Sequence, residues 1–218
     1  VCTSTDLKDK RLRSSLMVES DSHRFVIDSG PDFRQQMLRE KVDSLDGIIF
    51  THEHKDHIAG LDDVRAFNYL NHKAMEFFYI FNGDNYPGIP KINLHTIDEQ
   101  PFEASGLKFI PIPVMHMRLP VLGFRMGGFS YITDANFISD KSKELLLNSE
   151  VLVLNSLRRE KHVSHFNLEE AMELVDELKP KMTYLTHISH QLGKHEEVEQ
   201  ELPDNIRLAY DGLAVILD

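Results

Sequence analysis

The sequence predicts an α+β fold in which two β-sheets pack together with helices on the outside. Short β-prone runs dominate the first part of the chain, and in the second part such runs alternate with helix-like segments. The chain has 218 residues, 41% of them hydrophobic, which is enough to bury a substantial core. No low-complexity tract or linker divides it. We therefore expect a single domain over residues 1–218.

The first half of the chain combines β-prone runs with turn residues. The run Phe25–Ile27 ends at Asp28, and Gly30 and Pro31 turn the chain immediately afterwards. A second apolar run leads into a polar, histidine-rich stretch, and a helix-like segment follows it. We expect strands at 25–27 and 48–51, and helices at 33–39 and 61–70.

The second half repeats strand and helix in alternation. The segment 168–178 has Asn167 at its predicted cap, Glu170 three residues later and Pro180 beyond its end, which is a capping-box pattern. Asp211-Gly212 separates two apolar runs, which predicts a closing hairpin or a kinked strand. The elements expected here are helices at 142–147 and 168–178, a buried strand at 151–154, and the two runs at 208–210 and 213–217.

The most informative stretch is Thr51–His57, which follows the apolar run Gly47–Phe50. It brings three imidazoles and the Asp56 carboxylate into six residues. Neutral imidazole and carboxylate are the ligands that ions such as Zn²⁺ prefer. A tight loop leaving a strand can turn alternate side chains toward one point, so His52 and His54 are predicted to share one ion while Asp56 and His57 reach a second.

Further ligand-type residues recur far along the chain, each where a β-prone run ends. His116 follows 109–115, Asp134 follows 129–133, and His187 follows 182–186. A fortuitous surface tract of histidines would not be accompanied by this repeated pattern. The sequence therefore predicts a shared metal centre built from residues distant in the chain.

These residues resemble the metallo-β-lactamase superfamily, whose signature is HxHxDH followed by a distant His, an Asp and a last His. The resemblance covers nearly the whole chain and implies a four-layer αββα sandwich that forms one metallo-β-lactamase-like hydrolase domain. Position 54 is His rather than the Glu typical of the flavodiiron branch, which favours hydrolysis over oxygen chemistry. The resemblance implies that one metal is held by His52, His54 and His116, that the other is held by Asp56, His57 and His187, and that Asp134 bridges them.

Two phrases, 28–36 and 186–190, resemble the phosphoribosyl cyclic phosphodiesterase branch of the superfamily, a cousin of the tRNA 3′-processing nucleases. This resemblance implies a binuclear metal-dependent hydrolase in which a metal-bound hydroxide attacks a phosphodiester, and a small cyclic phosphodiester is the expected substrate. Two divalent ions, Zn²⁺ or Mn²⁺, are the expected cofactors. Asp28 would orient a ligand or the ligand loop by hydrogen bonds without binding metal.

His165 lies 22 residues before His187, the spacing of a catalytic histidine in these relatives. An imidazole can donate a proton near neutral pH, so we expect His165 to protonate the leaving oxygen or stabilise its charge. We count it as catalytic together with Asp56, which is also a predicted ligand. Arg34 and Arg158 could contact phosphate, although no spacing supports this. The histidines left without a role are His23, His72, His95, His162 and His195.

A structural zinc is a further feature of the branch, held by a Cys-rich loop near the N-terminus and by a His three residues after the last catalytic ligand. Cys2 and His190 match these positions, so both are candidate ligands of a structural Zn²⁺. The family's first strand and the other loop cysteines are missing from this sequence. One thiolate and one imidazole do not complete a four-coordinate site, so a free thiol and a hydrogen-bonded histidine remain the alternative.

The segment that follows the helix-like stretch 60–72 also departs from the family. It passes from the aromatic run 74–81 directly to the turn-rich run 82–88, where relatives have another strand and helix. Either residues are missing near Phe77 or the segment is short. Missing residues beside the site would be consistent with a lid.

Composition limits the classes of partner and substrate that this protein can have. The formal net charge is −11, from 35 acidic and 24 basic residues, and this acidity opposes a long nucleic-acid substrate. No run approaches the roughly 20 apolar residues of a membrane span, and one cysteine fits a reducing compartment. We therefore expect a cytoplasmic enzyme of a small phosphodiester, with no membrane partner. A homodimer is expected on the resemblance alone.

Three alternatives remain open at this stage, because fold alone does not choose a reaction. The same metals could serve a thioester or lactone hydrolase similar to glyoxalase II. They could equally serve a tRNA 3′-processing-type nuclease. A protein of another class, a non-catalytic metal-dependent binding protein or an accessory protein of cofactor biosynthesis, would hold the metal with no open coordination position.

Overall fold

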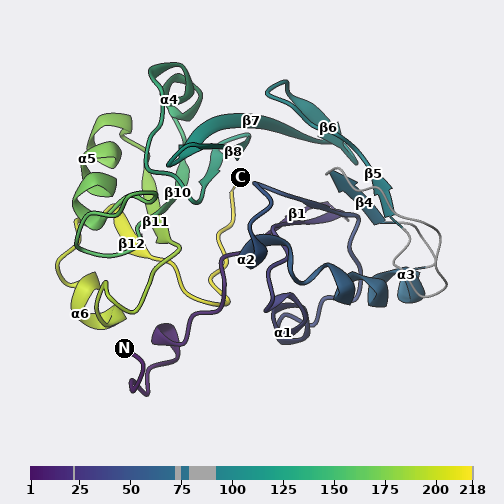
Figure 1. The fold of residues 1–218 in the computed structure, drawn as a ribbon, viewed down its shortest axis with the longest axis horizontal. Coiled ribbons are helices and arrows are strands. Elements are labelled where there is room, and N and C mark those ends of the chain that lie inside the picture. Colours follow the sequence, from purple (N-terminus) through teal and green to yellow (C-terminus); the bar gives the residue numbers. More distant parts are fainter. Residues whose placement is uncertain (22, 72–74, 79–91, 218) are drawn as a thin grey trace. The chain divides into compact units, whose positions relative to one another are not determined.

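A computed structural model describes residues 1–21, 23–71, 75–78 and 92–217. It divides the chain into two compact units (Figure 1). One unit spans Arg13–Leu107, and we call it the motif unit because it contains the Thr51–His57 stretch. The other, the strand-end unit, combines Val1–Leu12 with Lys108–Asp218. Whether the whole chain forms a single domain stays a prediction.

The motif unit contains a mixed sheet whose strands follow chain order, β1-β2-β3-β4-β5. The first two strands are antiparallel, and each later neighbour pair is parallel. Buried β-branched and aromatic residues explain the central strands, since Val26 faces Ile48 in the register and neither is exposed. The strands of this sheet are β1 (Leu16–Ser20), β2 (His23–Ile27), β3 (Gly47–Ile49), β4 (Met75–Phe78) and β5 (Ile92–Leu94). The unit's residue range also contains β6 (Phe102–Ala104), which is not a strand of this sheet.

The helices of the motif unit bury their apolar faces against this sheet. Phe33 and Met37, four residues apart on α1, pack with Val26 and Ile48 in one core cluster. The predicted helix at 33–39 is confirmed, whereas the strand predicted at 48–51 ends at Ile49 and the helix predicted at 61–70 begins with a 3₁₀ turn. The helices are α1 (Phe33–Arg39), α2 (Lys55–Ile58), η2 (Leu61–Val64) and α3 (Arg65–Asn71).

The strand-end unit contains the larger sheet, in which β12, β11, β10, β9, β8 and β7 lie side by side in that order. Strands β7, β8 and β9 pair antiparallel, and β9, β10, β11 and β12 pair parallel. The parallel strands therefore end at one edge of the sheet. The strands are β7 (Leu107–His116), β8 (Leu119–Met126), β9 (Phe129–Ile132), β10 (Val151–Asn155), β11 (Met182–Thr186) and β12 (Ile206–Leu208).

Helices cover the parallel strands of this unit, and Figure 1 shows α5 beside β11 and β12. Leu174 and Leu178 of α5 share a core cluster with Leu185 and Ile206 of those strands. The predicted capping box is confirmed, because the Asn167 side chain accepts from the Glu170 backbone and the Glu170 side chain accepts from the Asn167 backbone. The helices are η1 (Leu7–Asp9), α4 (Asp140–Leu146), α5 (Leu168–Leu178) and α6 (His195–Glu199).

The closing hairpin predicted around Asp211-Gly212 is wrong. Strand β12 ends at Leu208 and pairs in parallel with β11, and residues 213–217 form no strand. The turn is tied elsewhere, because the Asp211 carboxylate accepts from the Leu12 backbone N–H at 3.1 Å. The chain beyond it has no ladder partner among the described residues, and the Ile216 side chain is 91% exposed.

The prediction that residues are missing near Phe77 falls largely on positions 79–91, which lie outside the described residues. His72 also lies outside them.

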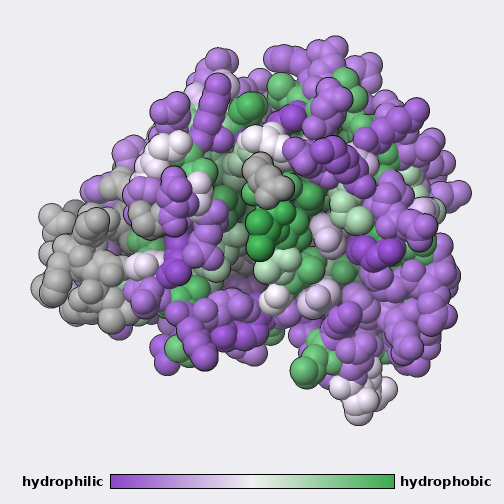
Figure 2. Space-filling model, turned by 180° about the vertical axis from the view of Figure 1, so that it is seen from behind, coloured by the Kyte–Doolittle hydropathy of each residue, from purple (hydrophilic) through white to green (hydrophobic). Residues whose placement is uncertain are grey.

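Hydrophilic side chains cover most of the face shown in Figure 2, with a hydrophobic group near its centre. This agrees with the acidic composition. No helix in the described ranges has the length and apolar character needed to cross a bilayer.

Candidate metal centre

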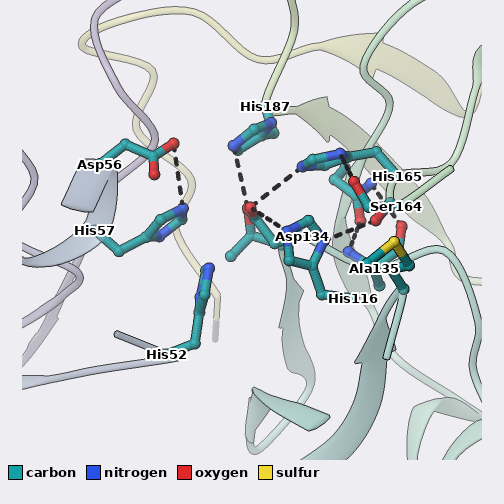
Figure 3. Close-up of polar contacts among 12 residues, drawn as sticks. His52, Asp56, His57, His116, Asp134, Ala135, Ser164, His165 and His187 are labelled. Carbon is teal, nitrogen blue, oxygen red and sulfur yellow. Dashed lines mark hydrogen bonds and ion pairs between the residues drawn. The ribbon is translucent and has the colours of Figure 1, made fainter. Parts of the chain in front are cut away.

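The motif unit places its four predicted ligands on one short loop and helix. Strand β3 delivers the chain to His52, and His54 caps α2, which carries Asp56 and His57. The rings of His52 and His57 are buried with centroids 4.3 Å apart, and the His52 and His54 rings lie 4.5 Å apart. Asp56 Oδ2 is 3.8 Å from His57 Nε2 (Figure 3). A single turn of chain therefore gathers three imidazoles and a carboxylate.

Asp28 lies fully buried behind this loop and contacts it three times. Its carboxylate accepts from the Thr51 backbone N–H at 2.9 Å, from the Thr51 hydroxyl at 2.8 Å, and from His57 Nδ1 at 2.7 Å. Burial raises the pKa of Asp28, and the contacts from His57 and Thr51 oppose that rise. With Nδ1 of His57 engaged, its Nε2 is the ring atom available to a metal, which is the usual arrangement of a carboxylate behind a ligating histidine.

Gly30 allows the helix with the ligands to approach the turn after β2. A Cβ at this position would lie 2.1 Å from the Asp56 carbonyl oxygen. The Gly60 backbone N–H donates to the Ser29 carbonyl at 2.8 Å and fixes the far end of α2 to the same turn. The phrase after Asp28 therefore positions the motif loop through close backbone packing.

The strand-end unit gathers its candidates from four separate segments, around one carboxylate. Figure 3 shows His116, His165 and His187 directed at Asp134. Asp134 Oδ1 is 3.1 Å from His187 Nε2, and Asp134 Oδ2 is 3.2 Å from His165 Nε2 and 4.0 Å from His116 Nε2. Asp134 is 2% exposed, so this carboxylate is held in a buried, histidine-rich environment.

The backbone at these positions is unusual. Asp28, Asp134 and His187, each one or two residues past a strand, have φ of 65°, 52° and 54°. Non-glycine residues seldom adopt this left-handed region, and strained residues of this kind cluster at functional sites. Each of these left-handed residues follows the end of its strand, and two of them, Asp134 and His187, are predicted ligands.

Two residues that the sequence analysis missed hold these turns in place. Asn155, fully buried at the end of β10, accepts from the Ala135 N–H and donates to the Ala135 carbonyl, both at 2.9 Å. The Ser164 carbonyl accepts from His116 Nδ1 at 2.8 Å. Asn155 follows an apolar run just as Asp134 and His187 do, so the same rule could have found it.

The donor set fits a divalent metal. Ligand atoms of Asp134, His165 and His187 lie within 4.8 Å of one another. Backbone or carboxylate acceptors engage the Nδ1 atoms of His57 and His116, leaving Nε2 as the ligating atom of each ring. Imidazole and carboxylate in this combination are borderline ligands, suited to Zn²⁺ and Mn²⁺ alike.

Cys2 and His190 do not form a comparable group. The Cys2 thiol is exposed and free, and His190 is exposed. Within the described ranges, no cluster of three ligand-type side chains contains either residue. The structural zinc stays a prediction. Arg158 donates to the Glu160 and Lys161 carbonyls and to the Gln191 side chain, so it supports its own loop.

Comparison with known proteins agrees with this geometry. The sequence model of a family described as "Beta-lactamase superfamily domain" matches residues 23–188. The crystal structure of a diphosphatase from the PhnP family has a TM-score of 0.92 and 38% identity, covering 100% of this chain and 89% of that one. The zinc-bound PqqB of Methylobacterium extorquens, at 17% identity and a TM-score of 0.73 over 95% of this chain and 88% of that one, shares the fold.

A further relative is the octanoyltransferase of Porphyromonas gingivalis (strain ATCC BAA-308 / W83), 37% identical over 233 residues. The match covers 100% of this chain but 47% of that protein, so the chain spans about half the length of this relative. The predicted resemblance and the α+β fold of the metallo-β-lactamase type are confirmed. The chain belongs to the β-lactamase superfamily of metal-dependent hydrolases.

Proposed function

We propose that this protein is a binuclear metal-dependent phosphodiesterase acting on a small, cyclic phosphodiester. The observation that carries the proposal is the carboxylate of Asp134 with three histidines directed at it from separate strand ends and loops. The 38% identity to a diphosphatase from the PhnP family, over the full length of this chain, supports phosphorus as the atom attacked. In this proposal the ligands predicted in the motif unit and those of the strand-end unit belong to one binuclear centre.

The metal ions, when bound, would supply an activated water and positive charge for the phosphoryl oxygens. His52, His54 and His116 would hold one ion, Asp56, His57 and His187 the other, and Asp134 would bridge them. Zn²⁺ or Mn²⁺ suits these ligands. Asp28 and the Ser164 carbonyl would keep His57 and His116 in one ring orientation each.

The reaction adds one water across a P–O bond. The hydroxyl part of the water ends on phosphorus, and the bond to the leaving oxygen breaks with its electron pair on that oxygen. His165 Nε2, beside Asp134, would give this oxygen a proton, and the proton released by the water would restore the imidazole, so that a cyclic diester and water become one monoester carrying a free hydroxyl. A small cyclic substrate needs no long, positively charged groove, which agrees with the net charge of −11.

A second function is favoured by one observation, the 37% identity to a protein named octanoyltransferase. That name concerns an acyl group, and the same metals and water could hydrolyse an acyl thioester. Because this chain corresponds to 47% of that relative, the octanoyl activity could reside in the other part of it. Hydrolysis of an acyl thioester is therefore the second candidate function.

Hydrolysis assays of the Mn²⁺- and Zn²⁺-loaded protein test the two functions together. The substrates are bis(p-nitrophenyl) phosphate, a ribose 2′,3′-cyclic phosphate and an octanoyl thioester. Asp134→Ala should reduce turnover by at least about 10³-fold, since it removes the shared carboxylate. His23→Ala, which changes a half-exposed histidine paired with Asp46 in the motif unit, should leave turnover unchanged.

Cleavage of both phosphodiesters without thioester cleavage, lost in Asp134→Ala, supports the proposal. Cleavage of the thioester alone would overturn it in favour of the second function. Two equivalents of bound metal with no turnover of any substrate would contradict both and leave a metal-dependent binding protein.

A further inference from the structure

The loop before α5 contains a second histidine, beyond the one assigned to proton transfer. His162 Nδ1 lies 3.2 Å from His165 Nδ1, on the side of the His165 ring opposite Asp134. The two ring centroids are 5.1 Å apart. Ser164 Oγ contacts both rings, 3.0 Å from His165 Nδ1 and 3.3 Å from His162 Nδ1. His165 therefore has a polar partner at each ring nitrogen.

The direction of these hydrogen bonds follows from one fixed donor. The Ser164 backbone N–H, which cannot reverse its role, points at His162 Nδ1 at 3.4 Å. His162 Nδ1 must therefore carry its lone pair, and its proton sits on Nε2. Since His162 Nδ1 is an acceptor, the contact with His165 is made by the His165 Nδ1–H, which Ser164 Oγ at 3.0 Å can also accept. His165 Nε2 is then the atom directed at Asp134, and it gives a proton from the ring that carries one on each nitrogen, because Nδ1 keeps its own.

The loop is built to hold His162 at this place. The Arg158 guanidinium donates to the Glu160 carbonyl at 3.3 Å and to the Lys161 carbonyl at 3.0 Å, and its Nη1 contacts Gln191. These contacts fix the backbone of the two residues that precede His162.

We propose that His162 is a positioning residue for the proposed hydrolase: it accepts the Nδ1–H of His165 and thereby fixes the ring with Nε2 toward the leaving oxygen. This inference rests on the proposed function and deepens it, because the sequence alone gives His162 no role. The proton still travels from His165 Nε2 to the leaving oxygen as the P–O bond breaks. His162 exchanges no proton with the substrate.

Such a role makes a prediction that depends on the leaving group. A ribose alkoxide is strongly basic and needs the proton as it departs, whereas p-nitrophenolate is weakly basic and leaves unprotonated. Loss of ring positioning should therefore slow cleavage of the ribose cyclic phosphate and spare bis(p-nitrophenyl) phosphate. A merely structural role for His162 would slow both substrates alike.

The experiment measures kcat and KM for both phosphodiesters with the metal-loaded wild type, His162→Ala and His162→Asn. For His162→Ala we expect kcat on the cyclic phosphate to fall about 10- to 100-fold, part of the range for acid–base catalysis. We expect KM to be unchanged and kcat on bis(p-nitrophenyl) phosphate to stay within about twofold of the wild type, since that leaving group needs no proton. His162→Asn, whose Oδ1 can replace the Nδ1 acceptor, should recover most of the loss. His23→Asn is the matched histidine control.

Bound metal and the thermal midpoint of each variant identify a folding defect. Equal losses on both substrates, or no loss on either, would overturn the positioning role while leaving the proposed function intact. Recovery by His162→Asn confined to the cyclic phosphate would establish it, even with a lowered midpoint. If the wild type cleaves neither phosphodiester, the proposed function fails and this inference fails with it.

Discussion

The two units assemble their candidate ligands in opposite ways. The motif unit takes four ligands from six consecutive residues and fixes them by close backbone packing at Gly30 and by the buried carboxylate of Asp28. The strand-end unit takes its ligands from residues 116 to 187 and joins them through side-chain to backbone bonds at Asn155 and Ser164. Local ligands need a rigid loop, whereas distant ligands need ties between segments. The two halves should therefore fail differently when perturbed.

The strongest test of the distant half is Asn155→Ala. It leaves the buried N–H and carbonyl of Ala135 without their partner, at about 1–3 kcal/mol each, so the free energy of unfolding should fall by about 3 kcal/mol. Turnover should fall as well, because Ala135 follows Asp134 in its left-handed turn. Urea unfolding and kcat measure the two effects.

Thr183→Val is the matched control for the burial of a polar side chain in the same sheet. Thr183 Oγ1 is buried and has no hydrogen-bond partner among the described residues, so replacing its hydroxyl by a methyl should be neutral or stabilising by up to about 1 kcal/mol. A comparable loss in both variants would show that burial, and not the tie to Ala135, matters at Asn155.

The corresponding test of the local half is Gly30→Ala. The added Cβ would meet the Asp56 carbonyl oxygen at 2.1 Å, so α2 must shift, at about 1–3 kcal/mol of unfolding free energy. Metal affinity should weaken in parallel because Asp56 and His57 are on that helix. Titration with Zn²⁺ beside thermal unfolding measures both, and a loss of stability with unchanged affinity would argue that Gly30 does not position the motif.

The contrast between the halves also explains what could be predicted from the sequence. The motif from His52 to His57 is local, so spacing alone identified it, and apolar runs located the strands that precede His116, Asp134 and His187. The capping box of α5 was readable for the same reason, since its two partners are three residues apart.

Features that depend on distant partners could not be predicted in this way. The clamp of Asn155 on Ala135 joins positions 20 residues apart, and although Asn155 follows an apolar run, no local pattern identifies Ala135 as its partner. The apolar run 213–217 has strand-like composition, yet the tie of Asp211 to Leu12 leaves it without a ladder. A strand requires a neighbour, and composition describes only the strand itself.

A smaller effect is expected for Asp28→Asn, which keeps the shape of the side chain and removes its charge. The contact to His57 Nδ1 loses its ionic character, so metal affinity should fall about 10- to 100-fold, as is usual for residues behind a ligand. Competition with a chromophoric chelator measures the affinity. An unchanged affinity would mean that the Thr51 contacts of Asp28, and not its charge on His57, explain its burial.

The smallest effect is expected at His195, a buried histidine whose ring contacts a cation, Arg11. The ring of His57, by contrast, contacts the carboxylate of Asp28. Arg11 donates to the buried His195 Nδ1 at 2.8 Å, and burial followed by the Arg11 charge lowers the pKa of His195 below 6.5. As pH falls through about 6.5, the unfolded chain binds this proton before the folded chain does, so folding loses stability until the lower pKa is passed. Between pH 7 and 5.5 the wild type should lose up to about 1 kcal/mol more than His195→Gln, whose amide oxygen accepts from Arg11 without titrating. Urea unfolding at both pH values measures the difference, and parallel losses in the two proteins would show that His195 is protonated as easily in the fold as in the unfolded chain.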